Sequence, residues 1–85
     1  MKILIICPAF NEAANIGKVI ERYKNLPDIS MLVVDDGSTD NTSLECKQYG
    51  VNIISHNKNC GYEKALETGI DYFLKSEFDH FVIAD

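Results

Sequence analysis

Two adjacent carboxylates, Asp35 and Asp36, follow four apolar residues in the stretch MLVVDDGSTDNT, residues 31–42. Two like charges side by side at the end of a hydrophobic run are costly unless something binds them. Gly, Ser and Thr come next, and these residue types favour a turn. The pair is therefore predicted either to hold a ligand or to brace a turn before the next helix.

The segments around this pair alternate between apolar runs and amphipathic stretches. Apolar runs predict strands over 3–7, 29–34, 51–55 and 80–85. Apolar residues at helical spacing predict helices over 11–25, 41–49 and 62–73. Pro8 is expected to end the first strand and Asn11 to cap the first helix. Thr39 or Asp40 could cap the second helix, and Thr42 with Glu45 could form a capping box for it.

The order of these elements predicts an α/β fold, a three-layer Rossmann-like βαβαβαβ arrangement. Continuous apolar strands that alternate with helices indicate a parallel sheet with right-handed crossovers and helices on both faces. Ligands of such sheets bind beyond the carboxyl ends of the strands. Four segments lie there, namely CPAFNE, DDGSTD, SHNKNCG and the terminal AD, and three of them carry carboxylates.

Composition narrows the class of protein. The chain has 85 residues, enough for one domain, and 46% hydrophobic with 25% charged residues is typical of an ordered globular protein. A net charge of −5 argues against nucleic acid as a partner. Three cysteines without a CxxC spacing indicate a reducing, cytoplasmic location. The N-terminal apolar run is too short to span a membrane.

Three common phosphate-binding folds do not match the motifs. A dinucleotide site needs a glycine-rich turn after the first strand, and the chain has no glycine before Gly17. A receiver domain needs an acceptor aspartate after the third strand, where Ser55 and His56 stand instead. A P-loop needs GK[ST], which the sequence lacks.

Four segments together resemble a known enzyme family. IICPAFNEAANIGKVIE, VVDDGSTDNT, NKNCGYEKALETGI and HFVIAD look like consecutive parts of the inverting family 2 glycosyltransferases of the GT-A fold. They are most similar to the group that uses nucleotide sugars and polyprenyl-phosphate acceptors. The resemblance covers nearly the whole chain. It implies that residues 1–85 are the nucleotide-sugar-binding part of such a domain, truncated at its C-terminus.

The resemblance also implies roles for individual residues. By position, four residues are implied to line the nucleoside pocket, namely Pro8, Phe10, Glu12 and Asp36. The backbone at Ala84 is implied to run beside the ribose. Asp36 would accept a hydrogen bond from the base or ribose, and Asp35 would anchor the turn. Tyr62 and Glu63 replace a Lys and a Gly that are frequent in the family, so a phosphate contact there would fall to Lys64.

A divalent cation and a nucleoside-diphosphate sugar complete the implied site. Asp85 matches the first carboxylate of the D-x-D motif, which holds Mg²⁺ or Mn²⁺ against the diphosphate of a UDP- or GDP-linked sugar. The second aspartate, the catalytic base and the acceptor site are missing from the sequence, so the 85-residue chain is predicted not to turn over. In a longer parent protein the location would be the cytoplasm or the cytoplasmic face of a membrane.

Plainer interpretations stand beside these roles. The chain could be a non-catalytic α/β nucleotide-binding or interaction module, and Glu12 could serve only the first turn of its helix. His56 and His80 are expected to be surface or satisfied residues, and Cys7 and Cys60 to be inert small hydrophobes. An uncovered sheet edge would offer its unpaired backbone groups to a second copy, so a homo-oligomer is a further expectation.

Overall fold

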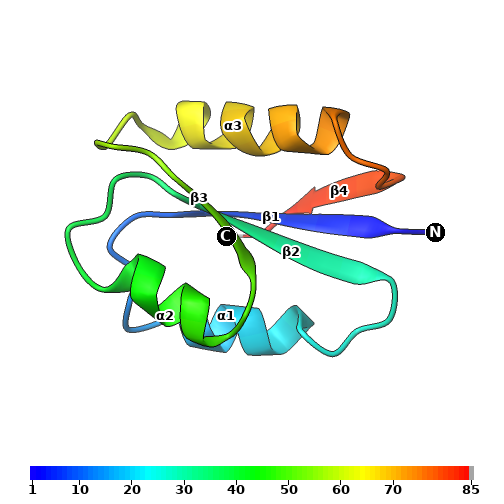
Figure 1. The fold of residues 1–85 in the computed structure, drawn as a ribbon, viewed down its shortest axis with the longest axis horizontal. Helices are drawn as coiled ribbons and strands as arrows, with labels where there is room; N and C mark the ends of the chain where they lie inside the picture. Colours follow the sequence, from blue (N-terminus) through cyan, green and yellow to red (C-terminus); the bar gives the residue numbers. More distant parts are fainter. Residues whose placement is uncertain (85) are drawn as a thin grey trace.

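Four parallel strands form the centre of the molecule, and helices cover both faces of the sheet (Figure 1). The structure is a computed structural model that describes residues 1–84. In chain order the elements are β1 (Ile3–Ala9), α1 (Ile16–Tyr23), β2 (Ile29–Asp35), α2 (Thr42–Gln48), β3 (Asn52–Ser55), α3 (Tyr62–Leu74) and β4 (His80–Ile83). The predicted βαβαβαβ order and the three-layer Rossmann-like architecture are confirmed.

The strand order β3-β2-β1-β4 places β1 and β2 at the centre of the sheet. The chain moves outward from β1 to β3, and then crosses to the other side of β1 to form β4. Ligands of open parallel sheets bind where the order reverses in this way. A ligand site is therefore expected at the carboxyl ends of β1, β2 and β4.

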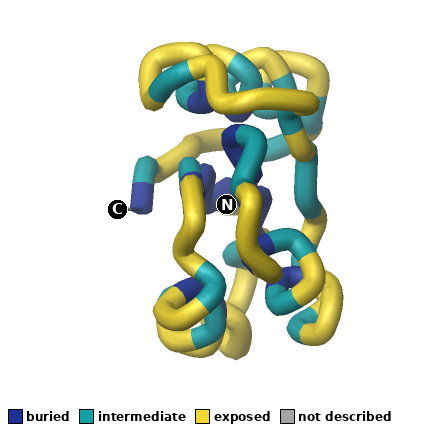
Figure 2. Tube along the Cα trace, turned by 90° about the vertical axis from the view of Figure 1, so that its left-hand side faces the viewer, coloured by how far each residue is buried: buried dark blue, intermediate teal, exposed yellow. Residues whose placement is uncertain are grey.

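The central strands are apolar throughout because each of their faces packs on a helical layer. In β1, Ile5 and Cys7 belong to the core shared with α1 and α2, whereas Leu4 and Ile6 belong to the core under α3. Figure 2 shows buried segments near the centre of the molecule, between outer parts that are mostly exposed. Successive strand residues point to opposite faces, so a sheet covered on both sides needs a continuous apolar run.

The first helix starts later than predicted, whereas α3 starts at the predicted residue and α2 within one residue of it. Asn11 does not cap α1, which begins at Ile16 after Asn15. Instead Asn11 has a positive φ of 53°, donates its N–H to the Ser38 hydroxyl (2.9 Å) and accepts the N–H of Thr39 (2.8 Å). An asparagine tolerates this left-handed conformation better than most residues. Its side chain thus joins the β1–α1 loop to the β2–α2 loop.

The predicted capping box of α2 is also wrong. Thr42 is the first helical residue, and its buried hydroxyl accepts the N–H of Glu12 (2.9 Å) across the two loops. The Asp40 carboxylate accepts the N–H of Thr42 (2.9 Å) and that of Ala13 (3.2 Å). The Thr42 hydroxyl therefore serves a contact between the loops rather than a capping box, whereas Asp40 bonds both to the start of α2 and across to the first loop.

Strand β1 continues through Pro8 rather than ending there. Pro8 pairs in register with Val34 on β2. The backbone N–H of Ala84 donates to the carbonyl of Ile6 at 2.9 Å, so the backbone groups of Ile6 point toward β4. Pro8, two residues further on, is the next position of β1 whose backbone groups point toward β4. Strand β4 has ended by that point, so the missing N–H of Pro8 removes no ladder bond between the described strands.

None of the helices in residues 1–84 is long and apolar enough to cross a membrane.

Candidate functional site

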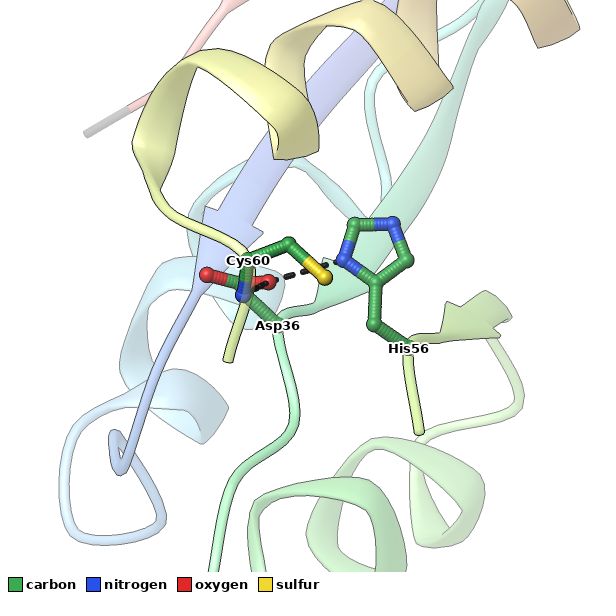
Figure 3. A group of neighbouring side chains, drawn as sticks. All are labelled: Asp36, His56 and Cys60. Atoms are coloured by element: carbon green, nitrogen blue, oxygen red, sulfur yellow. Dashed lines mark hydrogen bonds and ion pairs between the residues drawn. The ribbon is translucent and has the colours of Figure 1, made fainter. Parts of the chain in front are cut away.

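Asp36 directly follows β2 and is only 4% exposed. Its N–H donates to Ala9 on β1 at 2.8 Å. Its carboxylate accepts three hydrogen bonds, from Nδ1 of His56 (2.8 Å), the N–H of Cys60 (2.8 Å) and the N–H of Gly61 (2.9 Å). Figure 3 shows how His56 and Cys60 approach this carboxylate from the segment after β3.

These donors keep the Asp36 carboxylate ionised. Burial by itself would raise the pKa of the carboxyl group, but the hydrogen bonds from His56, Cys60 and Gly61 outweigh it and hold the pKa below its usual value. An ionised carboxylate has about four acceptor positions. Three are filled, two on Oδ1 and one on Oδ2. Asp36 can therefore accept one further hydrogen bond, through Oδ2.

Gly37 allows the two loops to meet. Its φ of +71° is a conformation that glycine adopts without strain. A Cβ at this position would also collide with the backbone of Lys58 and Asn59. A glycine after Asp36 is thus required for the loop between β3 and α3 to reach the carboxylate.

A cavity of about 290 Å³ opens beside Asp36 at the carboxyl end of β1. Its walls are formed by Pro8, Ala9, Phe10, Asp36, Asn59, Gly61, Tyr62 and Ala65. Phe10 and Tyr62 are 44% and 54% exposed. The cavity is thus bordered by two aromatic rings and by the buried carboxylate of Asp36. A planar ring with an N–H group could contact both kinds of wall.

A larger hollow of about 440 Å³ lies at the opposite end of the sheet, near Lys2, Ile29 and Phe78. Its charged residues, among them Glu77, are exposed. No buried ionised group faces it in the described part of the chain. The smaller cavity is therefore the better candidate for a specific site.

The structure brings Pro8, Phe10 and Asp36 together around one cavity, as part of the predicted set. Glu12 is exposed and lies outside its lining. Lys64 is also outside, and its Nζ donates to Oε1 of Glu67 (3.3 Å) one helical turn further on. Of the residues predicted to contact a nucleoside or its phosphates, Glu12 and Lys64 thus do not border this cavity.

The other two described candidates are buried near the edge of the sheet. Asp35 is 4% exposed, and its carboxylate accepts the N–H of Ser38 at 3.0 Å, which holds the turn that follows β2. Ala84 is 5% exposed and follows β4, next to β1. Neither residue lines the cavity.

Sequence reasoning missed the residues that hold Asp36. His56 is partly buried and has both ring nitrogens paired, Nδ1 with Asp36 and Nε2 with the Thr68 hydroxyl (2.8 Å). Cys60 is exposed rather than packed as a small hydrophobe. The predicted parallel pairing contained a usable signal, since it sets the residue after β3 beside the residue after β2. In the structure the backbone N–H of His56 donates to the backbone carbonyl of Asp35 (2.9 Å).

A hard cation does not fit the one group of potential metal ligands found among residues 1–84. The ligand atoms of Asp36, His56 and Cys60 lie within 4.8 Å of one another. Mg²⁺ and Mn²⁺ prefer oxygen ligands, whereas this group supplies one oxygen, one nitrogen and one sulfur. The predicted metal ligand Asp85 lies outside the described residues.

Comparisons with known proteins agree with the fold and the motifs. The chain is 42% identical over 69 residues to an uncharacterised protein, MJ1222, of Methanocaldococcus jannaschii, with 81% of the chain and 28% of that protein covered. It is 29% identical over 82 residues to a dodecaprenyl-phosphate galacturonate synthase of Rhizobium johnstonii, with 84% of the chain and 24% of that protein covered.

A solved structure matches almost the whole chain. Glucosyl-3-phosphoglycerate synthase from Mycobacterium tuberculosis, in complex with Mn²⁺, UDP and glucosyl-3-phosphoglycerate, superposes with a TM-score of 0.81 at 26% identity. The match covers 99% of the chain and 33% of that protein. The chain therefore spans between about a quarter and a third of the length of these three proteins.

The sequence profile described as "Glycosyl transferase family 2" matches residues 4–78, which include the strand ends and loops that form the cavity. The resemblance expected from the motifs is thus confirmed, and the chain belongs to glycosyl transferase family 2.

Proposed function

We propose that the cavity beside Asp36 binds the nucleoside of a UDP- or GDP-linked sugar, as the donor half of an inverting glycosyltransferase. One observation supports this most strongly: the buried, ionised Asp36 keeps a single acceptor position beside a cavity bordered by Phe10 and Tyr62. A nucleobase offers a planar face for such rings and an N–H for such an oxygen.

The remaining residues are proposed to serve the same ligand from the edge of the cavity. Ala84 would follow the ribose, Glu12 would support the first loop, and Lys64 would approach the phosphates after leaving Glu67. Asp35 would hold the turn through its bond with Ser38. These roles follow from the family motifs and from the position of each residue near the carboxyl ends of the strands.

A Mg²⁺ or Mn²⁺ ion is proposed to accompany the donor, with Asp85 as one ligand. When bound, the ion would neutralise charge that develops on the departing diphosphate. The M. tuberculosis structure contains Mn²⁺ together with UDP, which supports the pairing of metal and nucleotide. The residues of this chain would bind the nucleoside and orient it, while Asp36 accepts its hydrogen bond.

The acceptor and the setting of the reaction are proposed from the relatives. The Rhizobium relative is named for a dodecaprenyl phosphate, so a polyprenyl phosphate or a glycan is the acceptor we propose. Because those proteins are about three to four times as long, residues 1–85 would be the nucleotide-binding portion of a larger catalytic domain. Cys7, Cys46 and Cys60 form no disulfide, which supports a cytoplasmic location, at the membrane face if the acceptor is a lipid.

Contact with a second copy is proposed for the outer edge of the sheet. Strand β4 is a sheet edge, and Phe81 and Val82 on it are 37% and 48% exposed. An exposed strand edge presents unpaired N–H and C=O groups that another strand can bind. Light scattering after size-exclusion chromatography would show a dimer if this edge pairs between copies.

Calorimetric titration with UDP and GDP tests the nucleotide site. Asp36→Ala should weaken binding by roughly 1–3 kcal/mol, because the N–H of the base loses a buried partner. Asp71→Ala on the exposed face of α3 is a matched control and should bind like the wild type. Unfolding curves recorded in parallel separate lost affinity from lost structure, because Asp36→Ala also leaves three protein donors unpaired.

Two outcomes would count against the proposal. Unchanged affinity for a folded Asp36→Ala variant would remove Asp36 from the site. Nucleotide binding by a full-length parent protein that transfers no sugar to any acceptor would instead favour the non-catalytic nucleotide-binding module.

A further inference from the structure

Three side chains of different chemistry converge beside the cavity, and one of them, Asp36, forms part of its wall. Asp36, His56 and Cys60 offer a carboxylate oxygen, a ring nitrogen and a sulfur within 4.8 Å of one another (Figure 3). This mixture of donors is typical of zinc rather than of Mg²⁺ or Mn²⁺. We propose that the three residues form a Zn²⁺ site with a fourth, open position for water, distinct from the metal that would accompany the nucleotide.

The surrounding hydrogen bonds are those that zinc ligands need. A metal-binding histidine almost always donates its other ring N–H to a fixed partner, and ligating carboxylates are themselves hydrogen-bonded. Nε2 of His56 lies 2.8 Å from the Thr68 hydroxyl. The Asp36 carboxylate accepts the N–H groups of Cys60 and Gly61. Asp36, which is buried, and His56, which is partly buried, are therefore already oriented by the protein.

The ligand distances require only small movements. Nδ1 of His56 and Oδ1 of Asp36 are 2.8 Å apart, as a hydrogen-bonded pair. Zinc bonds of about 2.0–2.2 Å to nitrogen and oxygen would set the two atoms roughly 3.3 Å apart. Cys60 is exposed and its Sγ is bonded only weakly, to the Lys58 carbonyl at 3.3 Å. A rotation of this side chain would bring the sulfur to the ion, which enters from solvent.

The protons balance in a simple way. The Cys60 thiol loses its proton to solvent and binds as a thiolate. The ion replaces the Nδ1 proton of a neutral His56, and that proton is carried on Nε2 instead. The Thr68 hydroxyl lies within hydrogen-bond distance of Nε2 and can accept it. One proton is released for each ion bound.

Zinc titration against a chromophoric chelator tests the proposal on the chain as it stands. The wild type should bind one Zn²⁺ per chain more tightly than Mg²⁺ or Mn²⁺. His56→Gln and Cys60→Ser should each weaken Zn²⁺ binding at least tenfold. His80→Gln and Cys7→Ala are matched controls away from the trio, and both should bind like the wild type.

Cobalt and alkylation give readouts that identify the sulfur. Co²⁺ should produce a thiolate charge-transfer band in the wild type and in Cys7→Ala, but not in Cys60→Ser. Zn²⁺ should slow the alkylation of Cys60 by iodoacetamide in the wild type, a measurement that needs no variant. Burial raises the pKa of the Cys46 thiol to about 11, so that thiol should not react in either condition.

The overturning results are equally specific. A cobalt band that survives in Cys60→Ser, a Zn²⁺ affinity unaffected by His56→Gln, or alkylation of Cys60 that Zn²⁺ does not slow would each refute the site. None of these results bears on nucleotide binding, which is measured separately with UDP and GDP.

Discussion

At the scale of single residues, the role proposed for Asp36 depends on its neighbours more than on its position after a strand. Its carboxylate is fixed by a histidine side chain and two backbone N–H groups. His56 is fixed in turn by Thr68. A buried ionised group held by several donors loses little freedom when a ligand arrives, so such preorganisation favours binding.

Two variants of His56 separate its contacts. The side-chain amide nitrogen of asparagine is bonded to Cγ, as Nδ1 of histidine is, so His56→Asn can still donate to Asp36. Glutamine places its amide where Nε2 lies and reaches Thr68 instead. In metal-free buffer His56→Gln should lose about 0.5–1.5 kcal/mol of nucleotide binding energy, and His56→Asn should retain most of it. Equal losses in both variants would show that His56 acts only through general stability.

The sequence predicted part of the site at this scale. The motifs place Pro8, Phe10 and Asp36 at or just beyond the carboxyl ends of β1 and β2, and in the structure all three border one cavity. Strand pairing places His56 beside the end of β2, but the position of Cys60 depends on how the β3–α3 loop folds over Gly37, and loop paths are not encoded in hydrophobic periodicity.

At the scale of elements, the loops after β1 and β2 behave as one unit. Thr42 and Asp40 accept backbone N–H groups of the first loop, and Asn11 accepts one of the second. Apolar runs predicted every strand, since burial on both faces leaves a clear pattern. The start of α1 and the capping box of α2 were mispredicted because these contacts between loops override local capping preferences.

Acid should weaken this connection between the loops. Hydrogen bonds from Thr42, and then from Ala13, hold the pKa of Asp40 below its usual value of 3.8. A lowered folded-state pKa stabilises the protein above the unfolded-state value, and the benefit is lost as the pH falls through the folded-state value. The stability difference between the wild type and Asp40→Asn should thus be constant from pH 7 to 5 and shrink below about pH 4. A difference that grows in acid would contradict the assignment.

Helix α3 can lie close to the sheet because Gly69 has no side chain. A Cβ there would collide with Cγ2 of the fully buried Ile6. Gly69→Ala should therefore destabilise the fold by about 1–2 kcal/mol, since overpacking exceeds the gain in helix propensity. Gly17→Ala is the matched control, because its Cβ would meet only the end of the flexible Tyr49 side chain. Chemical denaturation should show little loss for Gly17→Ala, and equal losses in both variants would argue against close packing at Gly69.

At the scale of the whole molecule, the two ends of the sheet differ in kind. The carboxyl end has the buried ionised Asp36 and the aromatic rings of Phe10 and Tyr62. The amino end has a larger hollow bordered by exposed charges. Family membership and strand order favour the carboxyl end, and the volumes alone would have favoured the other.

A nitrogen–proton NMR titration with UDP and GDP tests this central claim most directly, because it reports on both hollows in one sample. We predict that one of the nucleotides shifts the backbone amides of Phe10, Gly61 and Tyr62, while those of Lys2, Asp28 and Glu77 stay in place. Shifts confined to the second group, or no shifts with either nucleotide at millimolar concentration, would contradict the assignment of the site.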